Sequence, residues 1–436
     1  MHLRAALLRL FTVVALTCFL STIVHSQVLV DCTGADVTAY PSINAALTAN
    51  TGPVTMLVTG PCSEYLWIQG RTGITIGAAW GQTVTITGQI VILESQSIYL
   101  YGLKVTNPWG SGFDIESSHG IVMDSCTSSN NYDVGMYVGN HANVIIQGTS
   151  AFNSNASGGL DIGGNSYVAA YLYDATLDIS NNSGPGIFLA SGSFSTLGNT
   201  KISGNTTNPS RPGFGIDARG GSHVQFGTIF GANLISGNEM GGVSLQELTE
   251  ASFWNGIGYP NTIQFNGPVG ILAGYSSQVT FYDSVQIVDH TGPAVDLFAK
   301  SQGYFFGANQ ISRNGNVSDP AGAAIRADGN SEVFLRGGNI SQNIGPGILA
   351  LVNSSVDFTG LTFSGNTGGL ITCDPTATMV SDLAGPNTTP PAGVRCKVPH
   401  ALGNRKIAKL VPKAPNFAVY KVMQARYKSM ATRKPK

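Results

Sequence analysis

The sequence predicts an all-β protein, a single-stranded parallel β-helix of about 12 to 13 coils with a short capping helix at its N-terminal end. The first observation is a repeat: an Asn is followed at a near-fixed distance by a Gly, or an Ala in its place, and then by alternating apolar residues. The Gly or Ala falls at positions 112, 135, 159, 186, 215, 242, 270, 294, 324, 347 and 369, in steps of 22 to 30 residues. A period of this size is typical of a solenoid, whose coils bury their apolar faces only against their neighbours.

The second observation is that each repeat holds three short apolar stretches with the period-two alternation of β-strands. Ile187 and Leu189 illustrate the stretch after the Gly, Val279 and Phe281 the next, and Ile340 the apolar position three residues before an Asn. Three strands of about five residues and three turns fill one triangular coil. A leucine-rich repeat has a similar period, but its leucine framework and helical stripe are missing. An antiparallel sandwich would not repeat like residues in like places.

The repeated Asn suits a corner, because Asn tolerates the left-handed conformation and its side chain can hydrogen-bond along a stack. The repeat units begin at Asn130, Asn155, Asn182, Asn205, Asn238, Asn266, Asn314, Asn343 and Asn366. His290 stands in the Asn place of one unit, and we interpret it as structural.

These units resemble the pectin-lyase-like, right-handed parallel β-helix superfamily over roughly residues 54–373. The units that carry the resemblance are Ser-Gly-Asn-Thr at 203–206 and 364–367, Asn-Ser-Gly-Pro-Gly-Ile at 182–187 and Asn-Ile-Gly-Pro-Gly-Ile at 343–348. The resemblance implies the fold, its right hand and a helix that plugs the first coil, which Ser42–Leu47 is placed to form. It leaves activity open, because family members include lyases, hydrolases, epimerases and non-catalytic surface proteins. The catalytic signatures of polygalacturonases, mannuronan epimerases and pectate lyases are missing.

The ends of the chain differ from its body. Residues 1–26 have the arginines, apolar run and small residues of a secretory signal, so we expect a protein that is extracellular, on the cell surface or periplasmic, with no membrane span in the mature chain. Residues 27–396 form the predicted β-helix domain with stapled caps. They hold 24 acidic and 10 basic side chains, a net charge of −14. Residues 397–436 are a basic tail with 11 basic and no acidic side chains, predicted to be disordered or partly helical at 417–430.

The cysteines of the mature chain suggest one staple at each end of the stack. We predict Cys32–Cys62 and Cys373–Cys396 disulfides, each closing a loop that stabilises by roughly 3–4 kcal/mol, and a free, buried Cys126.

Outward residues of the first strand should form a column, one residue per coil, ~4.8 Å apart. The column reads Asp114, Tyr137, Asp161, Phe188, Asp217, Ser244, Leu272, Asp296, Arg326, Leu349 and Ile371, and a second one runs from Glu116 through Arg219 to Cys373. Acids and aromatics alternate in the first five positions, an arrangement suited to holding sugar rings. Trp109, Tyr137, Phe188 and Arg211 are the predicted substrate-binding residues. The competing interpretation is an ordinary exposed sheet with surface ion pairs.

Catalysis is a further hypothesis for the same face. Asp114 and Asp161, or Asp161 and Asp217, have the two-coil spacing that suits an inverting glycosidase. Arg219 beside Asp217, overhung by the loop 206–214, suits a polyuronate lyase, the one case in which we expect Ca²⁺. Glu116 completes the set of candidate catalytic residues. A second insertion, 315–323, lengthens another turn on the same edge.

The sequence thus predicts a secreted β-helix that binds an extracellular polysaccharide or cell-wall polymer along its first-strand face, with processing left open. The alternatives are a non-catalytic structural or adhesive surface protein, and a polyuronate lyase or inverting glycoside hydrolase. No nucleic-acid, zinc or nucleotide motif is present.

Overall fold

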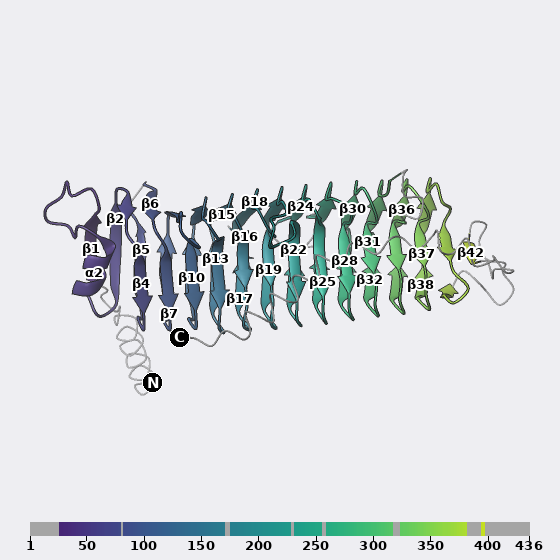
Figure 1. Cartoon of the computed structure of the whole chain (residues 1–436), viewed down its shortest axis with the longest axis horizontal. Helices are drawn as coiled ribbons and strands as arrows, with labels where there is room; N and C mark the ends of the chain where they lie inside the picture. The colour runs from purple at the N-terminus through teal and green to yellow at the C-terminus, as the bar shows by residue number, and fades with distance from the viewer. Residues whose placement is uncertain are drawn as a thin grey trace, which may run out of the picture.

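The computed structural model describes residues 26–79, 82–170, 175–227, 231–254, 259–316, 323–381 and 394–396. They form one elongated stack of coils with helix α2 at one end and strand β42 at the other (Figure 1). The signal segment 1–25, most of the insertion 315–323 and the basic tail lie outside the described residues. Among the described residues, no helix is both long and apolar enough to cross a membrane.

The strands fall into three sheets, which we call sheets A, B and C, and the helix is α2 (Ile43–Ala49). Sheet A contains β1 (Ser26–Asp31), β2 (Val54–Thr59), β5 (Ile74–Ala78), β8 (Tyr99–Tyr101), β11 (Ile121–Asp124), β14 (Asn143–Gln147), β17 (Tyr167–Ala170), β20 (Phe194–Leu197), β23 (His223–Phe226), β26 (Glu250–Trp254), β29 (Gln278–Tyr282), β32 (Gln302–Phe306), β35 (Glu332–Arg336), β38 (Ser355–Thr359) and β41 (Thr378–Ser381). Sheet B contains β3 (Cys62–Ser63), β6 (Val84–Thr87), β9 (Leu103–Thr106), β12 (Thr127–Ser129), β15 (Thr149–Asn153), β18 (Thr176–Ser180), β21 (Thr200–Ser203), β24 (Leu234–Ser236), β27 (Thr262–Gln264), β30 (Gln286–Val288), β33 (Gln310–Ser312), β36 (Asn339–Ser341) and β39 (Thr362–Ser364). Sheet C contains β4 (Leu66–Gln69), β7 (Ile90–Leu93), β10 (Phe113–Glu116), β13 (Val134–Gly139), β16 (Gly158–Ile162), β19 (Ile187–Leu189), β22 (Phe214–Arg219), β25 (Gly241–Gln246), β28 (Ile271–Gly274), β31 (Val295–Leu297), β34 (Ile325–Ala327), β37 (Ile348–Ala350), β40 (Ile371–Cys373) and β42 (Val394–Cys396).

Each coil contributes one strand to each sheet, and the strands pair in parallel with the coils before and after. Strand β10, for example, pairs in parallel with β7 and β13. The predicted parallel β-helix is confirmed. The described stack has about 14 coils, slightly more than expected, because the coils before residue 107 carry no repeat Asn and were undercounted.

The core fills the inside of the coils with stacked apolar side chains. Ile187, Val243, Phe281 and Ile340, taken from different repeats, are all buried to within 1% exposure, as the repeat predicts. Phenylalanine rings from consecutive coils stack inside the core, with ring centroids 4.4 Å apart for Phe226 and Phe253. The core is therefore a set of aligned columns, and each column depends on the coils staying in register.

Asparagines stack into a ladder at the corner that leads into sheet C, as predicted. In five successive coils, each side-chain Nδ2 donates to the Oδ1 of the next Asn, from Asn131 through Asn155, Asn182, Asn205 and Asn238 to Asn266, at 2.6 to 3.0 Å. The same Oδ1 also accepts the backbone N–H of the previous Asn, at 2.9 Å for Asn155 and Asn182. The first of these repeat units was placed one residue early: Asn131, not Asn130, is the ladder member.

The ladder, rather than the Gly, fixes where each strand of sheet C begins. Asn343 precedes Ile348 by five residues, and Asn366 precedes Ile371 by the same number. Ile348 and Ile371 pair in the inward row, so Thr372 follows Leu349 in the outward column. The predictions that Ile371 and Cys373 close the two outward columns were wrong, because both positions were counted from Gly369. Gly347 lies one position before its inward residue, Ile348, whereas Gly369 lies two positions before Ile371.

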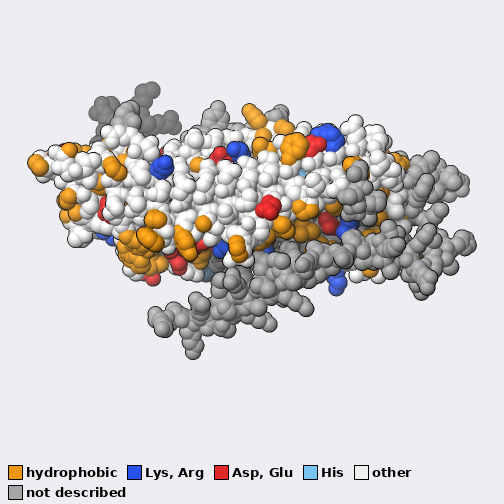
Figure 2. All heavy atoms as spheres, turned by 45° about the horizontal axis from the view of Figure 1, so that its top comes forward, with side chains coloured by type: hydrophobic (Ala, Val, Ile, Leu, Met, Phe, Trp, Pro, Cys, Tyr) orange, Lys and Arg blue, Asp and Glu red, His pale blue; other side chains and the backbone are white. Residues whose placement is uncertain are grey.

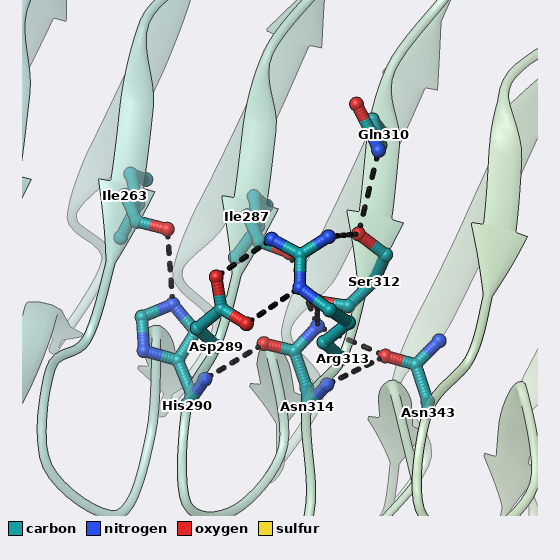
Figure 3. A network of polar contacts seen from close by, with 9 residues as sticks. All are labelled: Ile263, Ile287, Asp289, His290, Gln310, Ser312, Arg313, Asn314 and Asn343. Carbon is teal, nitrogen blue, oxygen red and sulfur yellow. Dashed lines mark hydrogen bonds and ion pairs between the residues drawn. The ribbon is translucent and has the colours of Figure 1, made fainter.

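His290 takes one place in the ladder (Figure 3). Its backbone N–H donates to Asn314 Oδ1 at 3.1 Å, and its Nδ1 accepts the backbone N–H of Asn266 at 3.2 Å. Its Nε2 lies 3.1 Å from the carbonyl oxygen of Ile263, which accepts its proton. The neutral ring thus reproduces the backbone contacts of a ladder Asn but not its side-chain bond to the next coil, and burial lowers the pKa of His290 to about 4. The structural interpretation of His290 fits this geometry.

The N-terminal end of the stack is capped as expected. Ser42 accepts a hydrogen bond from the N–H of Ala45 at the start of α2, and the Glu64 carboxylate accepts the N–H groups of Ile43 and Asn44 at 2.8 and 3.0 Å. The predicted Cys32–Cys62 disulfide is present. A helix and a staple therefore close the apolar end of the first coil.

The remaining cysteines are consistent with the predicted pattern. Cys373 is disulfide-bonded, and its register neighbour on β42 is Cys396, whose side chain lies outside the described residues. The Cys373–Cys396 pair therefore stays a prediction. Cys126 is free and buried, and burial raises its pKa to about 12, so the thiol is inert.

Replacing His290 with Asn should remove a pH dependence of stability. The unfolded His290 binds a proton below its ordinary pKa of 6.5, whereas the folded ring stays neutral down to about pH 4. The wild-type protein therefore loses stability as the pH falls from 6.5 to 4, by an amount on the order of 3 kcal/mol. Urea unfolding midpoints at pH 7.5 and 4.5 test this: His290→Asn should lose less than the wild type and less than the exposed-corner control His141→Asn. Parallel losses in all three proteins would show that His290 is not held neutral.

Candidate functional site

The predicted acid–aromatic column exists on the outer face of sheet C. Strand register places Asp114, Tyr137, Asp161, Phe188 and Asp217 opposite one another on five successive strands. The column also continues in the other direction, through Val91 to Trp67 on β4. This face therefore contains the five residues of the predicted acid–aromatic alternation, and it divides into a closed part and an open part.

The closed part is covered by the loop 206–213, whose Arg211 reaches back to the column. An Arg211 terminal nitrogen (Nη2) lies 2.7 Å from Asp161 Oδ2, and the Asp161 side chain is only 12% exposed. Arg219 holds Asp217 through two hydrogen bonds of 3.1 and 2.7 Å. Both guanidinium groups face the ring of Phe188, with Cζ 5.3 Å from its centroid for Arg211 and 6.0 Å for Arg219. In this structure an arginine occupies the space over Phe188 that the sequence assigned to a sugar.

The loop is fastened from several sides. The Asn208 side-chain amide donates to the carbonyl oxygens of Ala156 and Ser183. The backbone N–H of Thr207 donates to Glu239 Oε2 at 2.6 Å. The insertion is therefore packed against earlier coils and against the coil that follows it. These contacts hold Arg211 over the column.

Burial and pairing act on Asp161 in opposite directions. Removal from water raises the pKa of Asp161, and the Arg211 charge and hydrogen bond lower it, so that the pKa stays above its ordinary value. Asp217, fully buried, and Arg219 are tied to each other. Among the described residues of the column in the closed part, Asp161 and Asp217 are each paired with an arginine.

The open part surrounds Asp114. Burial, together with the nearby charges of Glu116 and Asp133, raises the pKa of Asp114 to about 6. Gln89 Nε2 donates weakly to Asp114 Oδ2 at 3.5 Å, and no hydrogen bond reaches Oδ1. Glu116 is turned away to accept a hydrogen bond from Asn140. A carboxylate held in this way costs folding stability at neutral pH, which is common at functional sites.

Four exposed aromatic residues come from the coils of β4, β10 and β13, the coils near Asp114 along the stack, and we call them the aromatic cluster: Tyr65, Trp67, Trp109 and Tyr132. They are 51%, 52%, 88% and 68% exposed, respectively. Tyr65 and Trp67 have nearly parallel rings with centroids 6.3 Å apart. Burial is the larger cause that raises the pKa of Tyr65, and the charge of Asp114 is the second. The Tyr65 hydroxyl is therefore near the Asp114 carboxylate.

Backbone contacts bring the corner residues of this region into line. The N–H of Leu66 donates to the carbonyl oxygen of Gln89, and the N–H groups of Tyr132 and Asp133 donate to Asn107 and Gly110. The corners that carry Tyr65, Gln89, Trp109 and Tyr132 therefore follow one another over four coils.

Sequence reasoning found Asp114, Tyr137 and Trp109 but missed the other members of this region. Trp67 lies two coils before Asp114, where no repeat Asn marks the coil, yet the 22- to 30-residue period and the alternation of Leu66–Gln69 could have located it. Tyr137 behaves as expected: a Cβ atom added to Gly139 would lie 2.5 Å from the Tyr137 hydroxyl oxygen, so its ring needs the small neighbour.

Charged side chains are sparse on the face of the stack that Figure 2 shows, while hydrophobic side chains gather in separate groups. Within the described ranges, the one group of acidic, His or Cys side chains spaced for a metal ion is Cys32, Cys62 and Glu64, and its two sulfur atoms are bonded to each other. The acids of the column do not form such a group.

Comparisons with known proteins agree with this architecture. Residues 88–255 match the model of the family described as "Right handed beta helix region". The chain thus has a right-handed parallel β-helix fold, which is the fold that its resemblance to the pectin-lyase-like superfamily implied.

Several solved structures are similar to the chain. The Azotobacter vinelandii mannuronan C-5 epimerase AlgE4 A-module aligns with a TM-score of 0.48 and 14% identity, covering 78% of this chain and 94% of that one. The A-module of mannuronan C-5 epimerase AlgE6 from the same organism aligns with a TM-score of 0.36 and 12% identity, covering 78% and 93%. The pectate lyase Pel9A aligns with a TM-score of 0.31 and 13% identity, covering 79% and 81%. No curated protein sequence matches the chain significantly.

Removing the Arg211 charge should destabilise the protein by leaving the Asp161 carboxylate buried without its cation. We expect Arg211→Gln to lower the free energy of unfolding by about 1–3 kcal/mol. Asp161→Asn in the same chain should recover part of that loss, because a neutral amide is less costly to bury. The matched control is Lys201→Gln, since Lys201 and Asp178 form an ion pair of 3.4 Å with side chains 52% and 39% exposed; its effect should stay below about 0.5 kcal/mol. Equal losses in the free energy of urea unfolding for Arg211→Gln and Lys201→Gln would show that Arg211 does not stabilise the buried Asp161 carboxylate.

Proposed function

We propose that this protein binds an extracellular polysaccharide through the aromatic cluster around Asp114. The single observation that carries the proposal is the exposure of Tyr65, Trp67, Trp109 and Tyr132 beside a carboxylate that lacks a full set of hydrogen bonds. Aromatic side chains of this size are usually largely buried. A group of them that stays exposed therefore indicates a binding surface.

The chemistry of the cluster suits a sugar. A pyranose ring has an apolar face that packs on an aromatic ring, and hydroxyl groups at its rim that donate to carboxylate oxygens. Asp114 Oδ1 is shielded from solvent, whereas Oδ2 is engaged only weakly by Gln89, which itself offers both a donor and an acceptor. The corners carrying the cluster span four coils, roughly 14 Å, which gives a chain ligand more than one contact.

The closed part of the column is left out of the proposed binding site. Phe188 faces two guanidinium groups, and Asp161 and Asp217 are paired with arginines. The site that we propose is therefore shifted toward the N-terminal end relative to the sequence-based prediction, and it retains Asp114, Trp109 and Tyr137 from that prediction.

The Cys32–Cys62 disulfide supports an oxidising compartment, in which extracellular polymers are the available polysaccharides. We propose binding as the function of this site; Asp161 and Asp217 of the closed part are each paired with an arginine.

Truncating the cluster tests the proposal. A panel of neutral and acidic polymers first identifies the polysaccharide that the wild-type protein binds. Trp67→Ala and Trp109→Ala should each weaken binding to that polysaccharide by roughly 10- to 100-fold, which corresponds to about 1–3 kcal/mol per stacking ring. Trp254→Ala is the matched control, because Trp254 is 51% exposed but lies on sheet A. Affinity electrophoresis and calorimetry measure the effect, and circular dichroism confirms folding.

Three outcomes would overturn this assignment. Equal losses in the Trp254→Ala control would show that the cluster is not the site. Failure to bind any polymer of the panel would favour a structural or adhesive protein. Release of reducing ends or of unsaturated products during incubation would favour a hydrolase or a lyase.

A further inference from the structure

A second aromatic surface lies on the outer face of sheet A, far along the chain from the aromatic cluster. Trp254, Tyr282 and Phe306 end three successive strands, β26, β29 and β32, and are directly paired in register. They are 51%, 39% and 38% exposed. Tyr304, on the same strand as Phe306, stacks on Phe334 with ring centroids 5.0 Å apart. We call these five residues the sheet A strip.

The strip does not suit a sugar. Its rings pack on one another: the centroids of Trp254 and Tyr282 lie 4.9 Å apart with the planes tilted by 53°, and those of Tyr282 and Phe306 lie 5.7 Å apart in a stacked arrangement. Rings stacked along the axis cover each other's faces and turn their edges outward, whereas a sugar packs on a free face. The strip is thus an apolar ridge that favours another apolar surface.

The surroundings of the strip are acidic. Glu250 and Glu332 begin β26 and β35, and Asp283 follows Tyr282 in an exposed turn. The nearby Arg336 is held by Asp357 through two hydrogen bonds, so it does not offset these charges. A second copy of this chain or an acidic lipid surface would meet like charge here, while a basic apolar segment would meet opposite charge.

One segment of this chain has the complementary chemistry. Residues 397–436 carry 11 basic and no acidic side chains. Within them, Phe417, Tyr420, Met423 and Tyr427 recur at helical spacing, with Lys421 and Arg426 between them and Lys428 directly after. A helix over 417–427 would be about 15 Å long and would match the length of three to four coils.

The segment is long enough to reach the strip. Strand β42 ends at Cys396, and 20 residues separate it from Phe417. An extended chain of that length spans up to roughly 65–70 Å. From β41 to β29 the order of sheet A crosses four strand spacings, roughly 19 Å.

We propose that the C-terminal segment around residues 417–427 docks in an intramolecular manner on the sheet A strip. Its apolar face covers Trp254, Tyr282 and Phe306, and its basic residues lie against Glu250, Asp283 and Glu332. The docked segment shields an aromatic face that would otherwise promote association between copies. This interaction does not depend on polysaccharide binding at the aromatic cluster.

Photo-crosslinking of the full chain tests the proposal. Phe306→p-benzoylphenylalanine should, on irradiation, form an adduct within the monomer to the tryptic peptides 414–421 or 422–426, identified by mass spectrometry. Tyr132→p-benzoylphenylalanine, placed beside the aromatic cluster, is the control and should not label these peptides. Tyr420→Asp combined with Met423→Asp should reduce the Phe306-position adduct at least tenfold, and raised salt should reduce it in part.

Every other result would overturn the proposal. Adducts found only in covalent dimers would identify a second copy as the occupant. Labelling of the segment from both positions alike would show a tail without a docking site. Absence of any adduct to peptides 414–426 would show that the strip has another partner or none.

Discussion

The stacked hydrogen bonds of the corner asparagines are the interaction on which the other features depend. Most ladder Oδ1 atoms accept both a side-chain and a backbone N–H from the coil before; Asn182, for example, is bonded through both its backbone N–H and its Nδ2 to Asn205. Parallel strands alone do not fix register, since a shift by one residue exchanges the inner and outer faces. A buried polar side chain that must meet its counterpart in the next coil excludes that shift, because an unmet partner costs about 1–3 kcal/mol.

The position of the functional face follows from this constraint. In most coils the first inward residue of sheet C lies five positions after the ladder Asn, so the outward residues one place later line up automatically. Where six residues are inserted, between Asn205 and Ile216, the ladder and the strand keep their places and the extra chain is expelled as a loop. That loop then carries Arg211 back over the column to Asp161. The closed part is thus produced by an insertion that the scaffold tolerates, and the open part around Asp114 lies in coils without such an insertion.

Sequence reasoning located the fold and the column because both depend on periodicity, which one chain displays many times over. It could not foresee that Arg211 would cover Phe188, since the path of an inserted loop depends on tertiary contacts such as those of Asn208. It missed Trp67 and Tyr65 because their coils lack the repeat Asn from which positions were counted. It misplaced the end of the column because it followed Gly369 instead of Asn366. Only the last of these errors arises because a local marker, a glycine, replaced the hydrogen-bonded ladder as the reference.

The ladder also explains why a histidine is tolerated at position 290. Only a side chain that offers an acceptor to the backbone N–H of Asn266 and a donor to the carbonyl oxygen of Ile263 can fill that place, and a neutral imidazole does both. The most direct test of the central role of the ladder is amide hydrogen exchange in Asn205→Ala. The account predicts that the backbone N–H of Asn182, which loses its acceptor, exchanges roughly 10- to 100-fold faster, while the strand amides of β16 stay protected. Unchanged exchange at Asn182 would show that the corner holds its register without the asparagine ladder.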